Sequence, residues 1–222
     1  MSRKSGFGVL VAALATIVGL TFAVTATPSA DAHSGHGSAA NKATFHDAMR
    51  QLWEDHIVWT RMFIVSAATE SGDLPDIGPT TARLLANQTD IGDALKPFYG
   101  EKVGDQVTAL LRDHILTAAD LVAAAKAKDA DAVKAASDRW YQNADDIATA
   151  LHDIDPKYVP LGAMKAHMKD HLDLTLEEAV ARLDGRYGDD IAAYDKIHEQ
   201  ILGMADMISD GIIKQFPGKF AS

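Results

Sequence analysis

Two histidines and two methionines recur with helical spacing in the segment MKAHMKDH. His167 and His171 are four residues apart, and so are Met164 and Met168. On an α-helix, residues spaced by four lie on one face, so both imidazoles could bind the same metal ion. Thioether and imidazole ligands together suit copper, especially Cu(I), better than a hard cation. The segment therefore predicts a copper site.

The following helical segment could complete this site. It offers His198, Met204 and Met207 as further ligands. The same methionines also fit a core without metal, because methionine at core spacing usually fills space. A H-x-x-x-H pattern without the glutamate of H-E-x-x-H is a weak metal signal, and the Glu-x-x-His pairs of di-iron bundles are absent from the sequence.

An Asp-His pair occurs three times within apolar helical patterns. The three histidines are His56, His114 and His171, and they are 58 and 57 residues apart. Each lies on the apolar face of its helix, so each is expected to point into the interior. A buried imidazole is costly unless it is hydrogen-bonded. His56 and His114 are therefore secondary metal-ligand candidates, or members of structural polar pairs.

Asparagines offer the structural alternative. Asn87 and Asn143 lie on the apolar face of the helix that follows the first two of these histidines, and His198 takes the corresponding place in the third case. An amide there could bond to the imidazole of the preceding helix, and such polar pairs fix the register of packed helices. In this interpretation no ligand binds. The preceding aspartates point about 100° away from their own histidines, so they cannot orient them directly.

Six helices must position these residues. Apolar residues recur at intervals of three and four, and no segment alternates as a strand would. Most of the helices exceed 20 residues and so are roughly 30–40 Å long. Breaks rich in glycine, proline and aspartate separate them at residues 71–79, 96–102, 126–131, 153–162 and 184–190.

The helices also repeat in pairs. NQTDIGDAL (87–95) and NADDIATAL (143–151) are 56 residues apart, close to the spacing of the histidines. The sequence therefore predicts an all-α bundle of six long antiparallel helices, built from three αα-hairpins over residues 43–98, 99–154 and 155–217. Because one hairpin cannot bury its apolar face alone, the three are expected to stack.

The first 32 residues resemble an export signal. Arg3 and Lys4 precede an apolar run over residues 7–25, and ADA at 30–32 provides the small residues of a cleavage site. The protein is expected to be secreted, with no stable membrane anchor after cleavage. Because the chain has no cysteine, an exported form must be stabilised by packing or ligands instead of disulfides.

The segment 33–42, HSGHGSAANK, is predicted to be a flexible arm. If cleavage follows Ala32, His33 becomes the N-terminus. Its amine and ring could then chelate Cu(II), and His36 could add an imidazole. The alternative is an arm that is simply solvated.

The net charge and the motifs of the sequence disfavour several classes of function. Without residues 1–32, which contain Arg3, Lys4 and Asp31, the net charge changes from −10 to −11. Such a charge opposes binding to nucleic acid or anionic membranes and attracts cations. The sequence has no G-x-S-x-G motif and no cysteine nucleophile, so a binding protein is favoured over an enzyme. Glu178 is predicted to be buried with a raised pKa, or paired with Arg182.

Four segments resemble a family of exported bacterial all-helical proteins: DHIVWTR, TARLLANQTDIGDALKPFYG, NADDIATALHDIDP and YDKIHEQILGMADMISDGIIKQFP. The resemblance covers residues 45–217 and implies the all-α fold and export. Members often carry the names acetylglutamate kinase or glycosyltransferase, but the resemblance implies no activity. The glycine-rich phosphate loop of a genuine acetylglutamate kinase is absent from this sequence.

A third hypothesis is a haem held without covalent attachment between a histidine and a methionine. The sequence has no C-x-x-C-H attachment motif. It favours a metal ion or small ligand as the partner, and it makes no prediction of oligomeric state.

Overall fold

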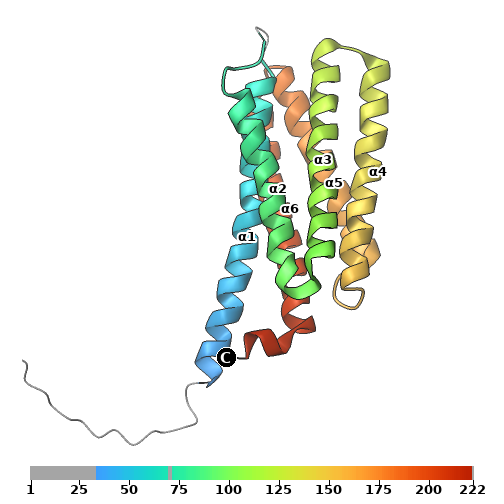
Figure 1. Ribbon diagram of the computed structural model, residues 1–222. Coiled ribbons are helices and arrows are strands. Elements are labelled where there is room, and N and C mark those ends of the chain that lie inside the picture. The colour runs from blue at the N-terminus through green and yellow to red at the C-terminus, as the bar shows by residue number, and fades with distance from the viewer. Residues whose placement is uncertain (1–33, 70–71, 222) are drawn as a thin grey trace, which may run out of the picture. The chain divides into compact units, whose positions relative to one another are not determined.

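The predicted helices are present in the computed structural model, which describes residues 34–69 and 72–221. Figure 1 shows six long antiparallel helices followed by one short 3₁₀ turn, which confirms the all-α prediction. The elements are α1 (Ser34–Ala67), α2 (Ile77–Tyr99), α3 (Glu101–Ala127), α4 (Ala130–Ile154), α5 (Leu161–Leu183), α6 (Tyr187–Gln215) and η1 (Pro217–Phe220). Over the described ranges, none of these helices is both long and apolar enough to cross a membrane.

The N-terminal predictions fall partly outside this description. The export signal and His33 are not among the described residues. Residues 34–42 form the first turns of α1 instead of the flexible arm that the sequence predicted. His36 lies in this helix, but the position of its side chain is not described.

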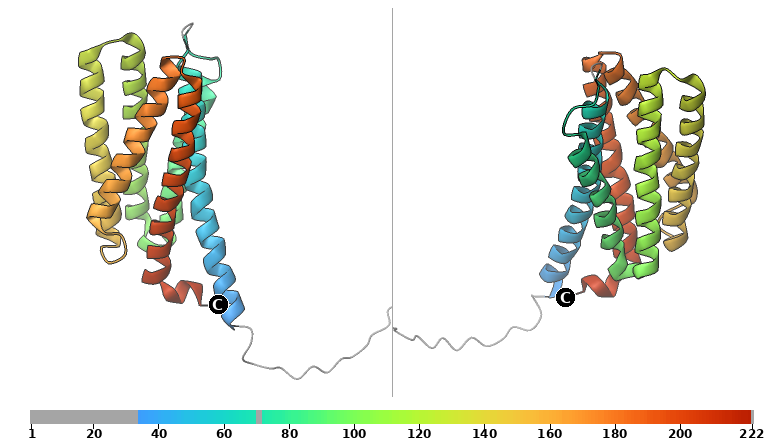
Figure 2. Two further views of the ribbon diagram at one scale, coloured as in Figure 1. Left: turned by 180° about the vertical axis from the view of Figure 1, so that it is seen from behind. Right: turned by 45° about the horizontal axis from the view of Figure 1, so that its top comes forward.

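The six helices form a closed ring. Each helix packs against the next one along the chain, and α6 packs against α1 (Figures 1 and 2). The helices α1, α3 and α5 run in the same direction and also contact one another across the interior. The three hairpins α1–α2, α3–α4 and α5–α6 are thus arranged with approximate threefold symmetry. Equivalent residues of α1, α3 and α5 are thereby brought to the middle of the bundle.

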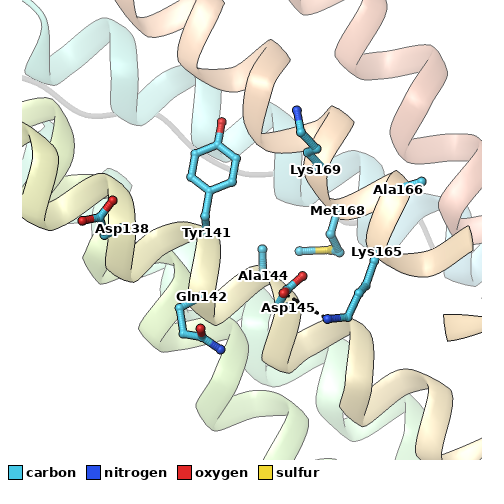
Figure 3. A pocket seen from close by; sticks show the side chains of 9 residues that line it. All are labelled: Asp138, Tyr141, Gln142, Ala144, Asp145, Lys165, Ala166, Met168 and Lys169. Atoms are coloured by element: carbon cyan, nitrogen blue, oxygen red, sulfur yellow. Dashed lines mark hydrogen bonds and ion pairs between the residues drawn. The ribbon is translucent and has the colours of Figure 1, made fainter. Parts of the chain in front are cut away.

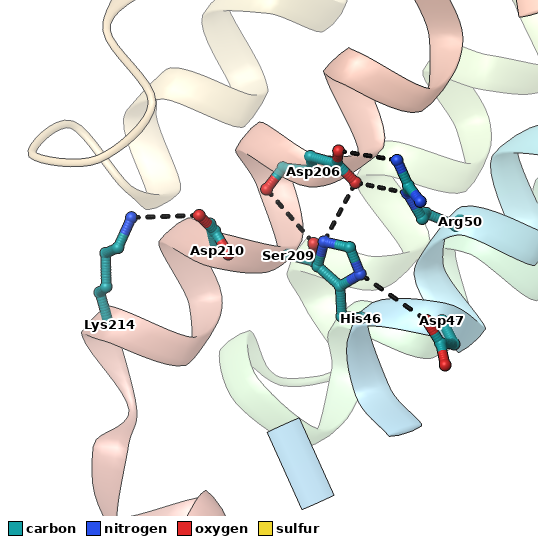
Figure 4. A network of polar contacts seen from close by, with 7 residues as sticks. All are labelled: His46, Asp47, Arg50, Asp206, Ser209, Asp210 and Lys214. Atoms are coloured by element: carbon teal, nitrogen blue, oxygen red, sulfur yellow. Dashed lines mark hydrogen bonds and ion pairs between the residues drawn. The ribbon is translucent and has the colours of Figure 1, made fainter. Parts of the chain in front are cut away.

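A charged contact joins the first and last helices of the ring. The guanidinium of Arg50 on α1 donates two hydrogen bonds to the Asp206 carboxylate on α6, at 2.7 and 3.0 Å (Figure 4). The Nε2 atom of His46 lies 3.1 Å from the same carboxylate. A bidentate guanidinium–carboxylate pair constrains relative orientation as well as distance, so this contact adds to the packing of α1 against α6.

Two glycines let α2 and α3 approach closely. A Cβ atom on Gly92 would lie 2.6 Å from the carbonyl oxygen of Gly104, and it would also overlap the side chain of Thr108. A Cβ on Gly104 would lie 2.7 Å from the carbonyl oxygen of Gly92. Because backbone atoms cannot move aside as a flexible side chain can, this crossing requires glycine at both positions.

Replacing Gly92 with alanine should therefore destabilise the protein. The steric cost, about 1–3 kcal/mol for overpacking, is expected to exceed the roughly 1 kcal/mol that alanine gains over glycine in a helix. Chemical denaturation followed by circular dichroism measures the difference. Gly162→Ala is the matched control, since no atom lies within 4 Å of a Cβ on Gly162. Equal stability of the two variants would contradict the close crossing.

Candidate functional site

Three imidazoles meet in the middle of the bundle. His56 on α1, His114 on α3 and His171 on α5 are only 2–3% exposed. Their ring centroids are 5.7 Å apart for His56 and His171, 6.3 Å for His114 and His171, and 6.5 Å for His56 and His114. We call these three side chains the histidine cluster. The sequence predicted their burial and equivalence, but not their mutual contact.

A threonine follows each of these histidines and bonds back to its own helix. The Thr60 hydroxyl donates to the carbonyl oxygen of His56 at 2.8 Å, and that of Thr175 donates to the carbonyl oxygen of His171 at 2.8 Å. The Thr117 hydroxyl similarly lies 3.1 Å from the carbonyl oxygen of His114. These hydroxyls are satisfied within their own helices, so they do not provide the hydrogen bonds that the imidazoles need.

In the second hairpin the predicted histidine–asparagine pair is confirmed. His114 Nδ1 lies 3.0 Å from Asn143 Oδ1. The Asn143 amide nitrogen donates to the carbonyl oxygen of Leu110 at 3.1 Å and to the Asp113 carboxylate at 3.2 Å. These contacts fix the amide orientation, so its oxygen faces the imidazole and can only accept. Nδ1 of His114 must therefore carry the proton, which leaves Nε2 with a free lone pair.

In the other two hairpins the amide partner is a glutamine. The side chain of Gln88 on α2 interacts with the His56 imidazole, and that of Gln200 on α6 interacts with the His171 imidazole. Neither contact is a closed hydrogen bond, because Nδ1 of both histidines and Oε1 of both glutamines are buried without a partner among the described residues. Each of these two hairpins thus places a carboxamide near the imidazole without completing the hydrogen bond that His114 makes.

The predicted partners Asn87 and His198 were therefore wrong. The Asn87 amide nitrogen donates to the carbonyl oxygen of Leu52 at 3.0 Å, and its oxygen accepts from Gln88 at 3.1 Å. His198 Nε2 lies 2.7 Å from a Glu54 carboxylate oxygen on α1. The sequence signal that was missed is that α2, α4 and α6 each carry an Asn or Gln side chain near the height of the histidines: Gln88, Asn143 and Gln200.

Burial keeps the histidine cluster uncharged. Loss of solvation lowers the pKa of His114 to about 3 and that of His171 to about 4, and it lowers the pKa of His56 well below its ordinary value. The neighbouring imidazoles of the cluster add to the lowering for His56 and His114. The arrangement thus presents three neutral imidazoles, the protonation state in which histidine binds metal ions.

The cluster is wider than a set of ligands closed around an ion. Three imidazoles on one ion at the usual metal–nitrogen distance would have ring centroids roughly 5.3 Å apart, against 5.7 to 6.5 Å here. Accordingly, within residues 34–69 and 72–221 no group of three or more His, Cys, Asp or Glu side chains stands arranged to hold a metal ion. Closing the cluster would require each ring to move inward by about half an ångström.

The copper ligands predicted on α5 and α6 do not come together in one site. Met164 and Met168 are buried on the same face of α5 as His171, whereas His167 is partly exposed. The His167 ring lies against Gly203, and its carbonyl oxygen accepts from Gln200 at 2.9 Å. His198 points instead toward α1. The structure therefore brings His171 together with His56 and His114 and turns His198 away from His167.

Met168 also lines a surface pocket between α4 and α5. This pocket has a volume of about 550 Å³, and Figure 3 shows Met168 beside the paired side chains of Lys165 and Asp145. The Lys165 ammonium lies 3.0 Å from the Asp145 carboxylate. The Tyr141 hydroxyl, also at this pocket, donates to Asp173 at 2.6 Å. Since these polar groups already bind one another, the pocket is a weaker site candidate than the histidine cluster.

Glu178 is buried as predicted, and burial raises its pKa to about 7. Its partner is not Arg182 but Arg61 on α1, whose guanidinium lies 2.6 Å from Glu178 and 2.7 Å from Asp190. Arg182 lies 3.4 Å from Asp190. Two arginines thus balance two buried carboxylates, so this network connects α1, α5 and α6 structurally.

No protein-family model, curated protein or solved structure matches this chain. The resemblance to exported bacterial helical proteins therefore stays a prediction. The chemistry of the site follows from its own residues, and their most distinctive arrangement is one buried neutral imidazole from each of three hairpins.

Proposed function

We propose that this protein binds one transition-metal ion, preferably Cu(I), between His56, His114 and His171. The observation that carries the proposal is the meeting of three buried imidazoles, one from each hairpin, with ring centroids 5.7–6.5 Å apart. The proposal keeps the predicted metal and keeps His171 as a ligand. It moves the site from the α5–α6 pair to the interior where α1, α3 and α5 meet.

The amides support a ligand role for the imidazoles. In metal sites the second ring nitrogen of a ligating histidine is usually bonded to another group, which fixes the tautomer and orients the ring. Asn143 holds Nδ1 of His114 in this way, and Gln88 and Gln200 stand beside the other two rings. With Nδ1 protonated, Nε2 is the nitrogen left to coordinate.

The absence of charge in the cluster favours a monovalent ion. Three neutral imidazoles do not neutralise a cation, and the cost of burying an ion rises steeply with its charge. Cu(I) carries one charge and is soft enough for imidazole and thioether ligands. Zn²⁺ carries two charges and usually takes four ligands in a tetrahedral site. The acidic chain, with its net charge of −10, also attracts cations.

Copper retention tests the proposal. Protein incubated anaerobically with excess Cu(I) and then desalted is expected to keep about one ion per chain, measured by atomic emission. His56→Ala should lose most of this copper, because tenfold or greater losses in affinity follow even from removal of groups that only orient ligands. His167→Ala and His198→Ala are matched controls that should keep it.

Two results would overturn the proposal. One is wild-type protein that retains no copper under these conditions. The other is retention by His56→Ala together with loss in His167→Ala, which would return the site to the α5–α6 ligands. Thermal stabilisation by copper alone does not decide, since any ligand that prefers the folded state raises stability.

The alternative function is a structural or interaction module without a ligand, in which histidine–amide pairs set the helix register. The closed bond between His114 and Asn143 favours it, because that pair is complete without any ion. The same copper measurement separates the two functions. Haem is a weaker hypothesis, because the pocket that adjoins the histidine cluster has a volume of about 30 Å³, which is too small for a haem.

A further inference from the structure

A small apolar pocket lies one helical turn beyond the histidine cluster. It has a volume of about 30 Å³ and is formed mainly by α1, α3 and α5. Thr60 and Thr175, which follow His56 and His171 by four residues, are among the residues that line it. Trp140 of α4 also lines it, and the Trp140 ring lies 5.4 Å from the ring of His114. The pocket therefore adjoins the imidazoles.

The walls of this pocket offer very little polarity. The hydroxyls of Thr60 and Thr175 are occupied by the carbonyl oxygens of His56 and His171. Most of the other lining residues are alanine, valine, leucine, isoleucine or phenylalanine. One polar group is unpaired, because Nε1 of Trp140 is buried without a partner among the described residues. The wall is thus almost entirely apolar, and one of its residues, Trp140, carries an unsatisfied N–H donor.

Size and polarity together define the occupant. The volume is about twice what one water molecule needs, and a water also needs two or more polar partners. Cavities of roughly 150 Å³ bind benzene, so this one is too small for an aromatic ring. A molecule of two or three heavy atoms fits, provided that it is apolar and accepts at most one hydrogen bond. Val180, one of the lining residues, is 38% exposed, so the lining reaches the surface of the protein.

We infer that this pocket binds a small apolar molecule of the size of dioxygen, beside the imidazoles of the histidine cluster. The inference goes beyond the proposed copper site and does not depend on it, since the pocket is present without an ion. If copper occupies the cluster, the bound molecule lies about one helical turn from it, roughly 5 Å along the bundle.

Xenon is a suitable probe because it is apolar, monatomic and only somewhat larger than dioxygen. The metal-free protein, labelled with ¹⁵N, is equilibrated with xenon gas while the three indole N–H resonances are recorded. The Trp140 resonance is expected to shift progressively and to saturate. The resonances of Trp53 and Trp59 should stay in place, because neither residue lines the pocket.

Filling the pocket should abolish the shift. Ala179→Leu adds a larger side chain at the lining of the pocket, and Ala118→Val is a milder second variant. The matched control is Ala192→Leu at an exposed position of α6, which should respond as the wild type does. A wild-type Trp140 resonance that does not move in xenon would overturn the inference, and so would equal shifts in the wild type and in both filled variants. Copper retention is measured separately, so failure of either idea is recognised independently of the other.

Discussion

Acidification from pH 7.5 to pH 4.5 is expected to lower the free energy of unfolding of the metal-free protein by roughly 4 kcal/mol. The cause is the histidine cluster, whose imidazoles are neutral in the folded protein because burial lowers their pKa. In the unfolded chain each imidazole takes up a proton near its ordinary pKa of about 6.5. The unfolded state therefore binds more protons than the folded state below that pH, and folding is penalised.

The pH window follows from these pKa values. Above pH 6.5 both states are neutral at these positions and the stability is complete. As the pH falls below 6.5, stability is lost until the folded imidazoles themselves take up protons, at about 4 for His171 and about 3 for His114. At pH 4.5 each ring has cost about 2–3 kcal/mol, which is a large part of a typical unfolding free energy of 5–15 kcal/mol.

Glu178 opposes this loss. Burial raises its pKa to about 7, so the folded protein takes up a proton there before the unfolded chain does. Between pH 7 and pH 4.5 this stabilises the fold by about 3 kcal/mol. The three imidazoles together lower the free energy of unfolding by roughly 7 kcal/mol, so acidification still destabilises the protein. Glu178→Gln should make the loss on acidification larger.

Urea denaturation at the two pH values measures the effect, since the extrapolated free energy in water is compared directly. His114→Leu removes one of the three imidazoles, so its stability should fall by about 2–3 kcal/mol less than that of the wild type on acidification. An unchanged pH dependence in His114→Leu would show that this ring does not titrate with unfolding as its burial requires.

The helices were predictable because local chemistry defines them. The break at 126–131, for example, contains Lys128 with a left-handed backbone and Asp129, whose carboxylate accepts from the Ala132 amide at the start of α4. The Asp129 cap is visible in the sequence, whereas the left-handed conformation of a lysine is not. The closure of the six helices into a ring could not be predicted in this way, because it depends on how the three hairpins pack against one another. The repeat at 57–58 residues predicted that the three histidines occupy equivalent positions. Their contact with one another follows only from the packing of the three hairpins in the closed ring.

The partners of the imidazoles show where sequence spacing was insufficient. Asn87 and Asn143 align in the sequence repeat, yet only Asn143 binds an imidazole. Neighbouring residues on a helix point about 100° apart, so Gln88 and its neighbour Asn87 cannot both face the same imidazole, and in α2 it is Gln88 that does. His198 and Gln200 differ by about 200° on α6. One therefore faces α1 while the other faces α5.

Two substitutions at His114 should destabilise the metal-free protein to different extents. In the metal-free protein at pH 7.5, His114→Ala is expected to cost about 3 kcal/mol, because it leaves a cavity and also leaves the Asn143 amide oxygen unpaired. His114→Leu should cost only about 1–2 kcal/mol, since leucine refills the volume and only the unpaired amide remains. Denaturant unfolding of the two variants measures the difference.

Copper retention by the same two variants tests the role of the ring nitrogen. Neither alanine nor leucine can coordinate, so both variants should lose the copper that the wild type keeps, although their stabilities differ. Asn143→Leu provides a further comparison, because it keeps the ligand but removes the amide that fixes its tautomer, and a 10–100-fold weaker affinity is expected. Full retention by His114→Leu would exclude this ring as a ligand and would contradict a copper site shared by the three histidines. Equal loss of stability in the alanine and leucine variants would show that the imidazole does more in the folded protein than fill space.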